Sequence, residues 1–141
     1  MNLPPYGICS PCWLVRVIDA DTIVVRLNPS SGREWHVRLL DCWAAEVNKA
    51  SQRPWGEPAK HYCEALVEQT LQLSIEVPHE VLRDDNGNID LLEAIDFGER
   101  LEAVVWLDSE TTLAEKLIEA GHAFDTKKEL HAFLREQGIE I

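Results

Sequence analysis

Two β-branched runs and an alternating segment in the first third of the chain constrain the fold most. Val17–Ile18 and Thr22–Leu27 flank the acidic turn 19–21, and a turn-forming sequence follows at 28–32. Residues 34–40 then alternate between apolar and polar side chains. Such segments are typical of short strands joined by tight turns. We therefore expect three consecutive antiparallel strands, with Asp19 and Asp21 at the corner between the first two.

The rest of the chain predicts two more strands and three helices. Residues 71–77 alternate and residues 101–107 are mostly apolar, which favours a strand at each. Pro58 suits the first turn of a helix that runs to about Thr70. Capping boxes at the start of 112–121 and 126–138, each closed by a glycine, predict the other two helices. The expected fold class is α+β and mainly β: a five-stranded OB-type β-barrel with three helices.

The 141 residues predict one domain. Residues 1–12 contain Pro4, Pro5 and Pro11 and are interpreted as an N-terminal arm, which leaves residues 13–141 as the domain. No apolar run is long enough to cross a bilayer, and the N-terminus lacks the pattern of a signal peptide. We therefore expect a cytoplasmic protein without a membrane partner.

The net charge of -12 opposes tight non-specific binding to nucleic acid. The charge is unevenly distributed, however. Residues 1–60 hold seven Lys and Arg against six Asp and Glu, whereas residues 61–141 hold six against 19. A phosphate-binding surface in the first part of the chain is therefore compatible with the overall acidity.

Four cysteines allow two interpretations. Cys9 and Cys12 have the spacing of zinc ligands, and Cys42 and Cys63 complete a site only if the fold gathers all four. Buried, reduced thiols are the simpler interpretation, since no second CxxC follows. Residues 84–93 also match the inner positions of an EF-hand loop in part, but an acidic hairpin or loop is favoured there, because no amphipathic helix precedes them.

Four short motifs carry a resemblance to a known family. They are Val-Ile-Asp-Ala-Asp-Thr-Ile at 17–23, Val-Arg-Leu-Leu-Asp-Cys-Trp-Ala-Ala-Glu at 37–46, the helix start at 55–59, and residues 113–123. In this order they resemble the thermonuclease-like (staphylococcal nuclease-like) domains, over roughly residues 13–135. The resemblance implies an OB-type barrel and a calcium-dependent nuclease site.

The resemblance also implies roles for particular residues. In this family two Asp bind calcium, two Arg contact the phosphate, and a Glu positions the attacking water. Asp21 matches the first metal ligand, Arg38 the first Arg, and Glu46 the Glu. Arg100 is the candidate for the second Arg, although an alternative alignment puts Glu99 there.

One departure from the family pattern bears directly on calcium. Trp43 stands where the second metal-binding Asp is expected. Asp41 is the candidate replacement, provided that a β-bulge re-aims it, because it otherwise shares the strand face of Leu39. We therefore expect calcium to be bound weakly or not at all.

Two functions from different classes remain. The first is a metal-dependent nuclease that hydrolyses phosphodiester bonds in DNA or RNA, weakened by Trp43. The second is a catalytically inactive OB-fold module that binds nucleic acid or a protein partner. Single-stranded DNA or RNA is the expected, weakly bound partner. Trp43 and Trp55 are candidate surfaces for base stacking, unless both pack against loops.

Overall fold

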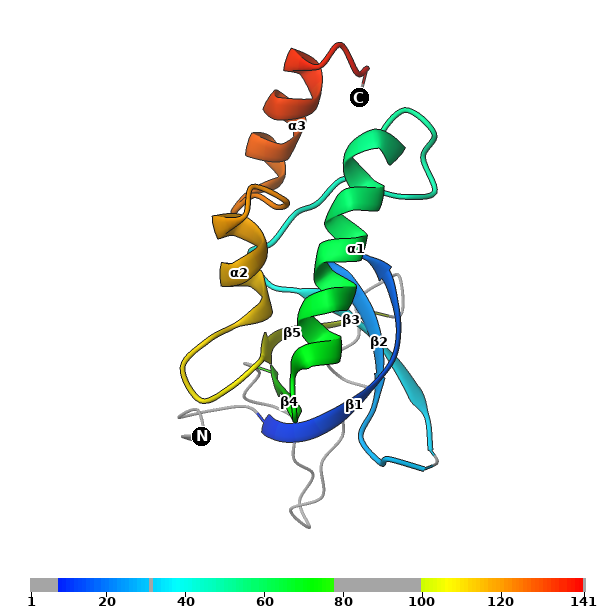
Figure 1. Cartoon of the computed structure of the whole chain (residues 1–141), viewed down its shortest axis with the longest axis vertical. Coiled ribbons are helices and arrows are strands. Elements are labelled where there is room, and N and C mark those ends of the chain that lie inside the picture. The colour runs from blue at the N-terminus through cyan, green and yellow to red at the C-terminus, as the bar shows by residue number, and fades with distance from the viewer. Residues whose placement is uncertain (1–7, 31, 78–99, 141) are drawn as a thin grey trace, which may run out of the picture.

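The computed structural model of the chain describes residues 8–30, 32–77 and 100–140. Five strands and three helices follow one another in these parts (Figure 1). They are β1 (Ile8–Asp19), β2 (Thr22–Arg26), β3 (Glu34–Leu39), α1 (Arg53–Gln69), β4 (Leu73–Val77), β5 (Arg100–Trp106), α2 (Leu113–Glu119) and α3 (Lys127–Glu136). The predicted α+β class, with five strands and three helices, is confirmed.

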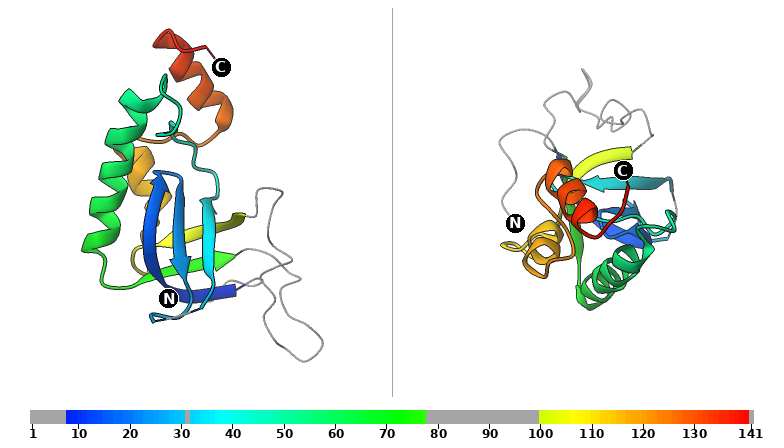
Figure 2. Two further views of the ribbon diagram at one scale, coloured as in Figure 1. Left: turned by 90° about the vertical axis from the view of Figure 1, so that its right-hand side faces the viewer. Right: turned by 90° about the horizontal axis from the view of Figure 1, so that it is seen from above.

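The strands close into a barrel in the order β1-β2-β3-β5-β4. Neighbouring strands are antiparallel except β3 and β5, which are parallel. The long strand β1 closes the barrel because its first part pairs with β4 and its second part with β2. Register shifts between Leu14 and Arg16 and between Val17 and Asp19 allow this strand to bend. The mixed barrel is compatible with an OB-type fold, and Figure 2 shows α1 along its side and α3 beyond its end.

The predicted arm over residues 1–12 is wrong for its last part, because β1 already begins at Ile8. Pro11 lies in this strand opposite Ser74 of β4. On the other side, β2 pairs with β1 only from Trp13 onward. Proline is tolerated in a strand where its missing N–H is not needed by a second neighbour. The prolines of the N-terminal sequence therefore misled the prediction.

The first helix also begins earlier than Pro58, the predicted start. Pro54 occupies the first turn, and Pro58 lies inside the helix. The carbonyl of Gln52 accepts hydrogen bonds from the amides of Trp55 and Gly56, which fixes the first turn. Two prolines four residues apart both suit a first turn, and the sequence did not distinguish them.

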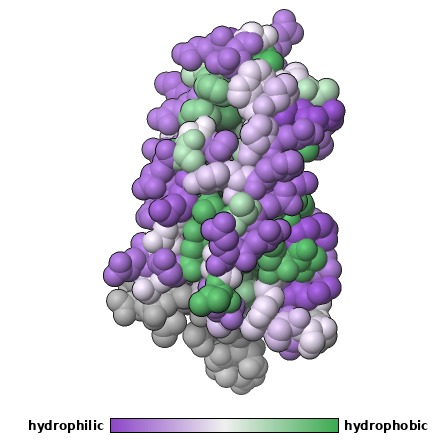
Figure 3. Space-filling model, viewed as in Figure 1, coloured by the Kyte–Doolittle hydropathy of each residue, from purple (hydrophilic) through white to green (hydrophobic). Residues whose placement is uncertain are grey.

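Two apolar clusters stabilise the molecule. The larger one fills the barrel and extends under α1 and α2. The smaller one lies under α3 and consists of Ala45, Leu130 and Leu134, with Trp43, Trp55, Phe124, Phe133 and Ile139 packed against it. Polar residues cover most of the face shown in Figure 3, where apolar residues show between α1 and the side formed by α2 and α3.

The capping box predicted for α2 is confirmed, and that predicted for α3 is present in one of its two hydrogen bonds. Thr112 accepts a hydrogen bond from the amide of Glu115, whose carboxylate accepts one from the amide of Thr112. Thr126 caps α3 through the amide of Glu129. Gly121 and Gly138 follow their helices with φ of 79° and 82°, a conformation that favours glycine.

Three further predictions concern the cysteines, the acidic loop and the membrane. Cys42 and Cys63 are buried thiols, and burial raises the pKa of each to about 12. Residues 78–99, with the predicted hairpin and the alternative calcium loop, lie outside the described residues. In the described parts of the chain, no helix has the length and apolar character that a bilayer crossing requires.

Candidate functional site

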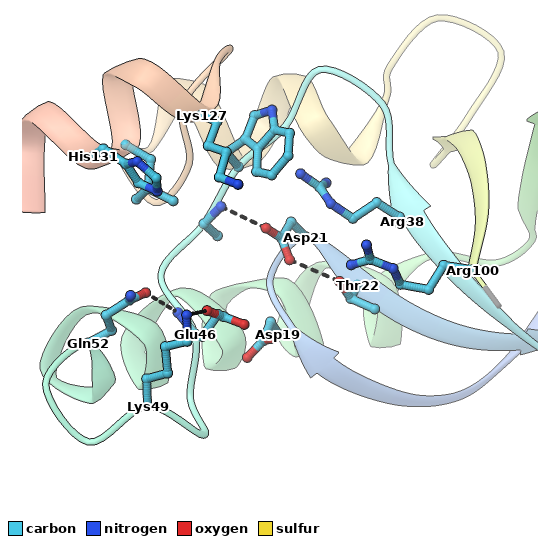
Figure 4. Close-up of a pocket in the computed structure, with 13 residues that line it drawn as sticks. Asp19, Asp21, Thr22, Arg38, Glu46, Lys49, Gln52, Arg100, Lys127 and His131 are labelled. Atoms are coloured by element: carbon cyan, nitrogen blue, oxygen red, sulfur yellow. Dashed lines mark hydrogen bonds and ion pairs between the residues drawn. The ribbon is translucent and has the colours of Figure 1, made fainter. Parts of the chain in front are cut away.

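A polar pocket of about 290 Å³ lies at one end of the barrel, below α3 (Figure 4). The β1–β2 corner, β3, the segment that follows β3, and the first residue of β5 form its barrel wall. Helix α3 forms the opposite wall. The pocket is lined by Asp19, Asp21, Thr22, Arg38, Trp43, Ala44, Glu46, Lys49, Gln52, Arg100, Lys127, Leu130 and His131. It brings together five of the seven predicted site residues.

The two carboxylates of the β1–β2 corner bind the segment that follows β3. Asp21 accepts hydrogen bonds from the amide of Ala44 at 2.8 Å and from the hydroxyl of Thr22 at 3.0 Å. Asp19 accepts one from the amide of Val47 at 2.8 Å. Hydrogen bonds to a charged acceptor are stronger than those between neutral groups. The acidic corner therefore fixes the path of residues 44–47 along the pocket.

Burial changes the proton affinity of both corner carboxylates. It raises the pKa of Asp21 above the ordinary 3.8, although the Arg38 guanidinium and the hydrogen bonds act in the opposite direction. Burial likewise raises the pKa of Asp19, against the hydrogen bond from Val47. Both groups therefore take up a proton at a higher pH than an exposed aspartate does. The pocket becomes more cationic as the pH falls.

Arg38 of β3 is buried, and the protein itself holds its guanidinium. One terminal nitrogen donates hydrogen bonds to the carbonyls of Leu39 and Cys42. The guanidinium carbon lies 3.9 Å from the centre of the Trp43 ring, a cation–π contact. Figure 4 shows Arg38 pointing toward the pocket near Asp21. Its position is therefore fixed before any ligand arrives.

Glu46 lies in the segment fastened by the acidic corner. Its amide donates to the side chain of Gln52 at 3.0 Å, and its carboxylate forms an ion pair with Lys49 at 2.7 Å. Gly56 of α1 packs against this segment so closely that a Cβ there would lie 2.9 Å from the carbonyl carbon of Glu46. Helix α1 therefore supports the segment from outside the pocket.

Trp43 connects the barrel wall of the pocket with α3. Its backbone forms a two-way hydrogen-bonded bridge with Phe124, at 2.8 and 2.9 Å. The Lys127 ammonium of α3 lies 5.6 Å from the centre of the Trp43 ring. Lys127 and His131 are four residues apart and share one face of α3. Both line the pocket on the side opposite the corner carboxylates (Figure 4).

Arg100 is the first residue of β5 and faces the same pocket. It is paired in register with His36 of β3, and the next residue pair includes Val37. The parallel pairing of β3 and β5 therefore brings Arg100 and Arg38 to the same end of the barrel. Figure 4 shows both guanidinium groups directed toward the interior of the pocket.

The other two predicted site residues lie outside this pocket. Asp41 is exposed, has a φ of 51°, and does not line the pocket. Trp55 lines a separate pocket of about 220 Å³ between α1 and α3, and its ring lies edge-on to Phe133 at 6.3 Å. Trp43 and Trp55 both pack against the cluster under α3. The rings therefore pack against α3 as well as against the segment after β3, and not against loops alone, as the alternative to base stacking had it.

The side chains present do not fit a calcium ion. Calcium prefers about six to eight oxygen ligands, several of them carboxylates. Both oxygens of Asp21 already accept hydrogen bonds, and the Glu46 carboxylate is paired with Lys49. Within residues 8–30, 32–77 and 100–140, no three His, Cys, Asp or Glu side chains are grouped so that they could hold a metal ion. The side chain of Cys9 lies outside the described part of the chain, so the alternative zinc site at Cys9 and Cys12 stays a prediction.

Sequence reasoning missed the lining residues Lys49, Gln52, Lys127 and His131. Lys127 and His131 are four residues apart, a spacing that is also common on solvent-exposed faces of helices. The bridge between Trp43 and Phe124 and the cluster under α3 bring this helix face over the barrel. A four-residue spacing alone therefore contains no signal for their place in the pocket.

No protein-family model and no curated protein matches this chain. The class of protein that the fold defines is accordingly a closed five-stranded mixed β-barrel with three helices, compatible with an OB-type fold.

Proposed function

We propose that this chain is a nucleic-acid-binding module with a thermonuclease-like barrel, and that its polar pocket binds a backbone phosphate of single-stranded DNA or RNA. One observation carries the proposal: Arg38, Arg100 and Lys127 line a single pocket at the end of the barrel. Guanidinium and ammonium groups are the side chains that bind phosphate most effectively. Three of them from separate elements favour an anionic ligand.

The local charge supports this ligand in spite of the acidic chain. Four cationic side chains and three carboxylates line the pocket, an excess of one positive charge, whereas the whole chain carries -12. Two of the three carboxylates, Asp19 and Asp21, accept backbone hydrogen bonds, which engages them within the fold. Overall acidity weakens long-range attraction to nucleic acid, so we expect modest affinity and strong dependence on salt.

A calcium-dependent nuclease is the second candidate. Asp21, Arg38 and Glu46 line one pocket, as the resemblance to thermonuclease-like domains requires. The donor set described above does not fit calcium, however, and Asp41 lies outside the pocket. We therefore rank hydrolysis below binding. Incubation of single-stranded DNA and RNA with the protein, in calcium and in chelator, separates the two functions.

The nuclease candidate predicts calcium-dependent products that disappear in Glu46→Gln. The binding module predicts intact substrate in both buffers. Glu46→Gln is a near-isosteric change at a half-buried position and removes only the charge that pairs with Lys49. A folded, inactive variant beside an active wild type would therefore establish hydrolysis as the function.

Fluorescence anisotropy with a short labelled single strand tests phosphate binding. Arg100→Gln removes a pocket cation, and Arg33→Gln is the matched control, because Arg33 is exposed and contacts Trp35 instead. We expect Arg100→Gln to weaken binding about tenfold and to lower the salt slope by about one, as for the loss of one phosphate contact. Absence of wild-type binding at low salt would contradict the proposal and leave a protein partner as the alternative.

A further inference from the structure

Helix α3 presents a second set of polar side chains to the pocket that the resemblance does not assign. Lys127 and His131 line the pocket, and the adjacent Lys128 does not. The ammonium of Lys127 and the guanidinium of Arg38 both lie over the ring of Trp43, at 5.6 and 3.9 Å from its centre. The Trp43 ring therefore has a cation of α3 and a cation of the barrel as neighbours.

We propose that Lys127 is a phosphate-binding residue, and that the pocket binds its phosphate without a metal ion because α3 supplies the positive charge. This inference rests on the proposed function. His131 adds a hydrogen-bonding group from the same helix face. The phosphate then lies between the barrel arginines and α3, with Trp43 as the residue that positions Arg38 and Lys127.

The sign of the pocket's charge depends on Lys127. With Lys127 the lining has four cations against three carboxylates; without it the numbers are equal. One of the other cations, Lys49, is already paired with Glu46 at 2.7 Å. A compact ammonium near a partly enclosed phosphate interacts more strongly than the same charge on an open surface. Lys127 thus changes a neutral lining into a cationic one.

The position of α3 is fixed well enough for this role. Leu130 and Leu134 are buried in the cluster under the helix, and Phe124 packs on Phe133 with ring centres 5.2 Å apart. The bridge between Trp43 and Phe124 joins the turn before α3 to the barrel segment. Pre-positioned groups bind more tightly, because less conformational freedom is lost on binding.

The test compares Lys127→Ala with Lys128→Ala, which removes the same charge one residue away on the same helix. Binding of a short single-stranded oligonucleotide, and competition by inorganic phosphate, are measured by anisotropy in chelator and, for the wild type, also without chelator. We expect Lys127→Ala to weaken binding about tenfold and to lower the salt slope by about one, and Lys128→Ala to change binding by less than about twofold. Lys127→Arg should restore most of the affinity.

The outcomes separate this inference from the proposed function. Equal losses in Lys127→Ala and Lys128→Ala, or wild-type binding that the chelator abolishes, would overturn the inference while leaving nucleic-acid binding intact. Wild-type protein that binds neither oligonucleotide nor phosphate would remove both. Melting temperatures of the variants establish that each loss arises in a folded protein.

Discussion

The two walls of the pocket differ in what their charged groups do for the fold. On the barrel wall, Asp21 and Arg38 are only 7% and 6% exposed, and each is hydrogen-bonded to backbone. On the α3 wall, Lys127 is exposed and His131 is half-buried. This buried pair of the barrel wall holds the structure together, whereas the α3 wall consists of groups that remain accessible to a ligand.

This difference indicates that some side chains of the pocket maintain its structure, whereas others are available to bind a ligand. Removal of a buried, paired charge leaves its partner uncompensated and strongly destabilises the fold. Removal of an exposed lysine affects stability little. Substitutions of the buried Asp21 and Arg38 should therefore act first on folding, and substitutions on the α3 wall should act first on binding.

The largest expected effect is that of Arg38→Ala. This substitution leaves the buried Asp21 without its counter-charge and removes two hydrogen bonds to backbone carbonyls. We expect the free energy of unfolding to fall by about 3–5 kcal/mol in urea titrations. Lys127→Ala, the comparison from the other wall, should change it by less than about 0.5 kcal/mol. Similar values for the two variants would remove the distinction between the walls.

Gly56→Ala tests the support that α1 gives to the barrel wall. A Cβ there would lie 2.9 Å from the backbone of Glu46, which cannot move without displacing the segment that Asp21 holds. We expect a loss of about 1–3 kcal/mol, although alanine is the better helix former. Glu57→Ala, at the next and exposed position, is the control and should be close to neutral. A more stable Gly56→Ala protein would mean that the segment yields easily.

The smallest effect is a change in how stability depends on pH. Burial raises the pKa of Asp21 above 3.8 in the folded protein, where Arg38, Asp19 and Thr22 face it. Folding thus favours the neutral form of Asp21. Its contribution to the free energy of unfolding is fully present below the pKa of the unfolded state and is lost as the pH rises through the pKa of the folded state. Relative to wild type, Asp21→Asn should therefore gain stability as the pH rises from 3.8 toward neutrality. A relative loss over this range, in urea titrations, would contradict the raised pKa.

The barrel wall was largely predictable from the sequence, because its signals are local. The β-branched run over β2 and the alternation over β3 predicted antiparallel strands, and the acidic turn placed Asp19 and Asp21 at the corner between β1 and β2. The distance in sequence from Arg38 to Glu46 led to both residues, which line the pocket. Asp41 was expected in the site but does not line the pocket, because its positive φ directs the chain away from regular strand geometry.

The α3 wall was not predictable, because its place depends on contacts between distant residues. The capping box at Thr126 predicted the helix, but no local pattern relates Lys127 to the barrel. That relation comes from the bridge between Trp43 and Phe124 and from the small cluster under α3. Trp43 drew attention as a missing metal ligand, whereas in the structure it stacks on Arg38 and contacts α3.

The most direct test of the account is a nuclear magnetic resonance titration of the isotope-labelled protein with a short single-stranded oligonucleotide in chelator. If a phosphate enters between the two walls, the largest amide shifts fall on Ala44, Val47 and Lys127. The amide signals of residues such as Leu14 and Val67, which do not line the pocket, then stay unchanged. Shifts that gather around Leu14 and Val67, or shifts at Ala44 and Val47 without Lys127, would contradict a phosphate site formed by both walls.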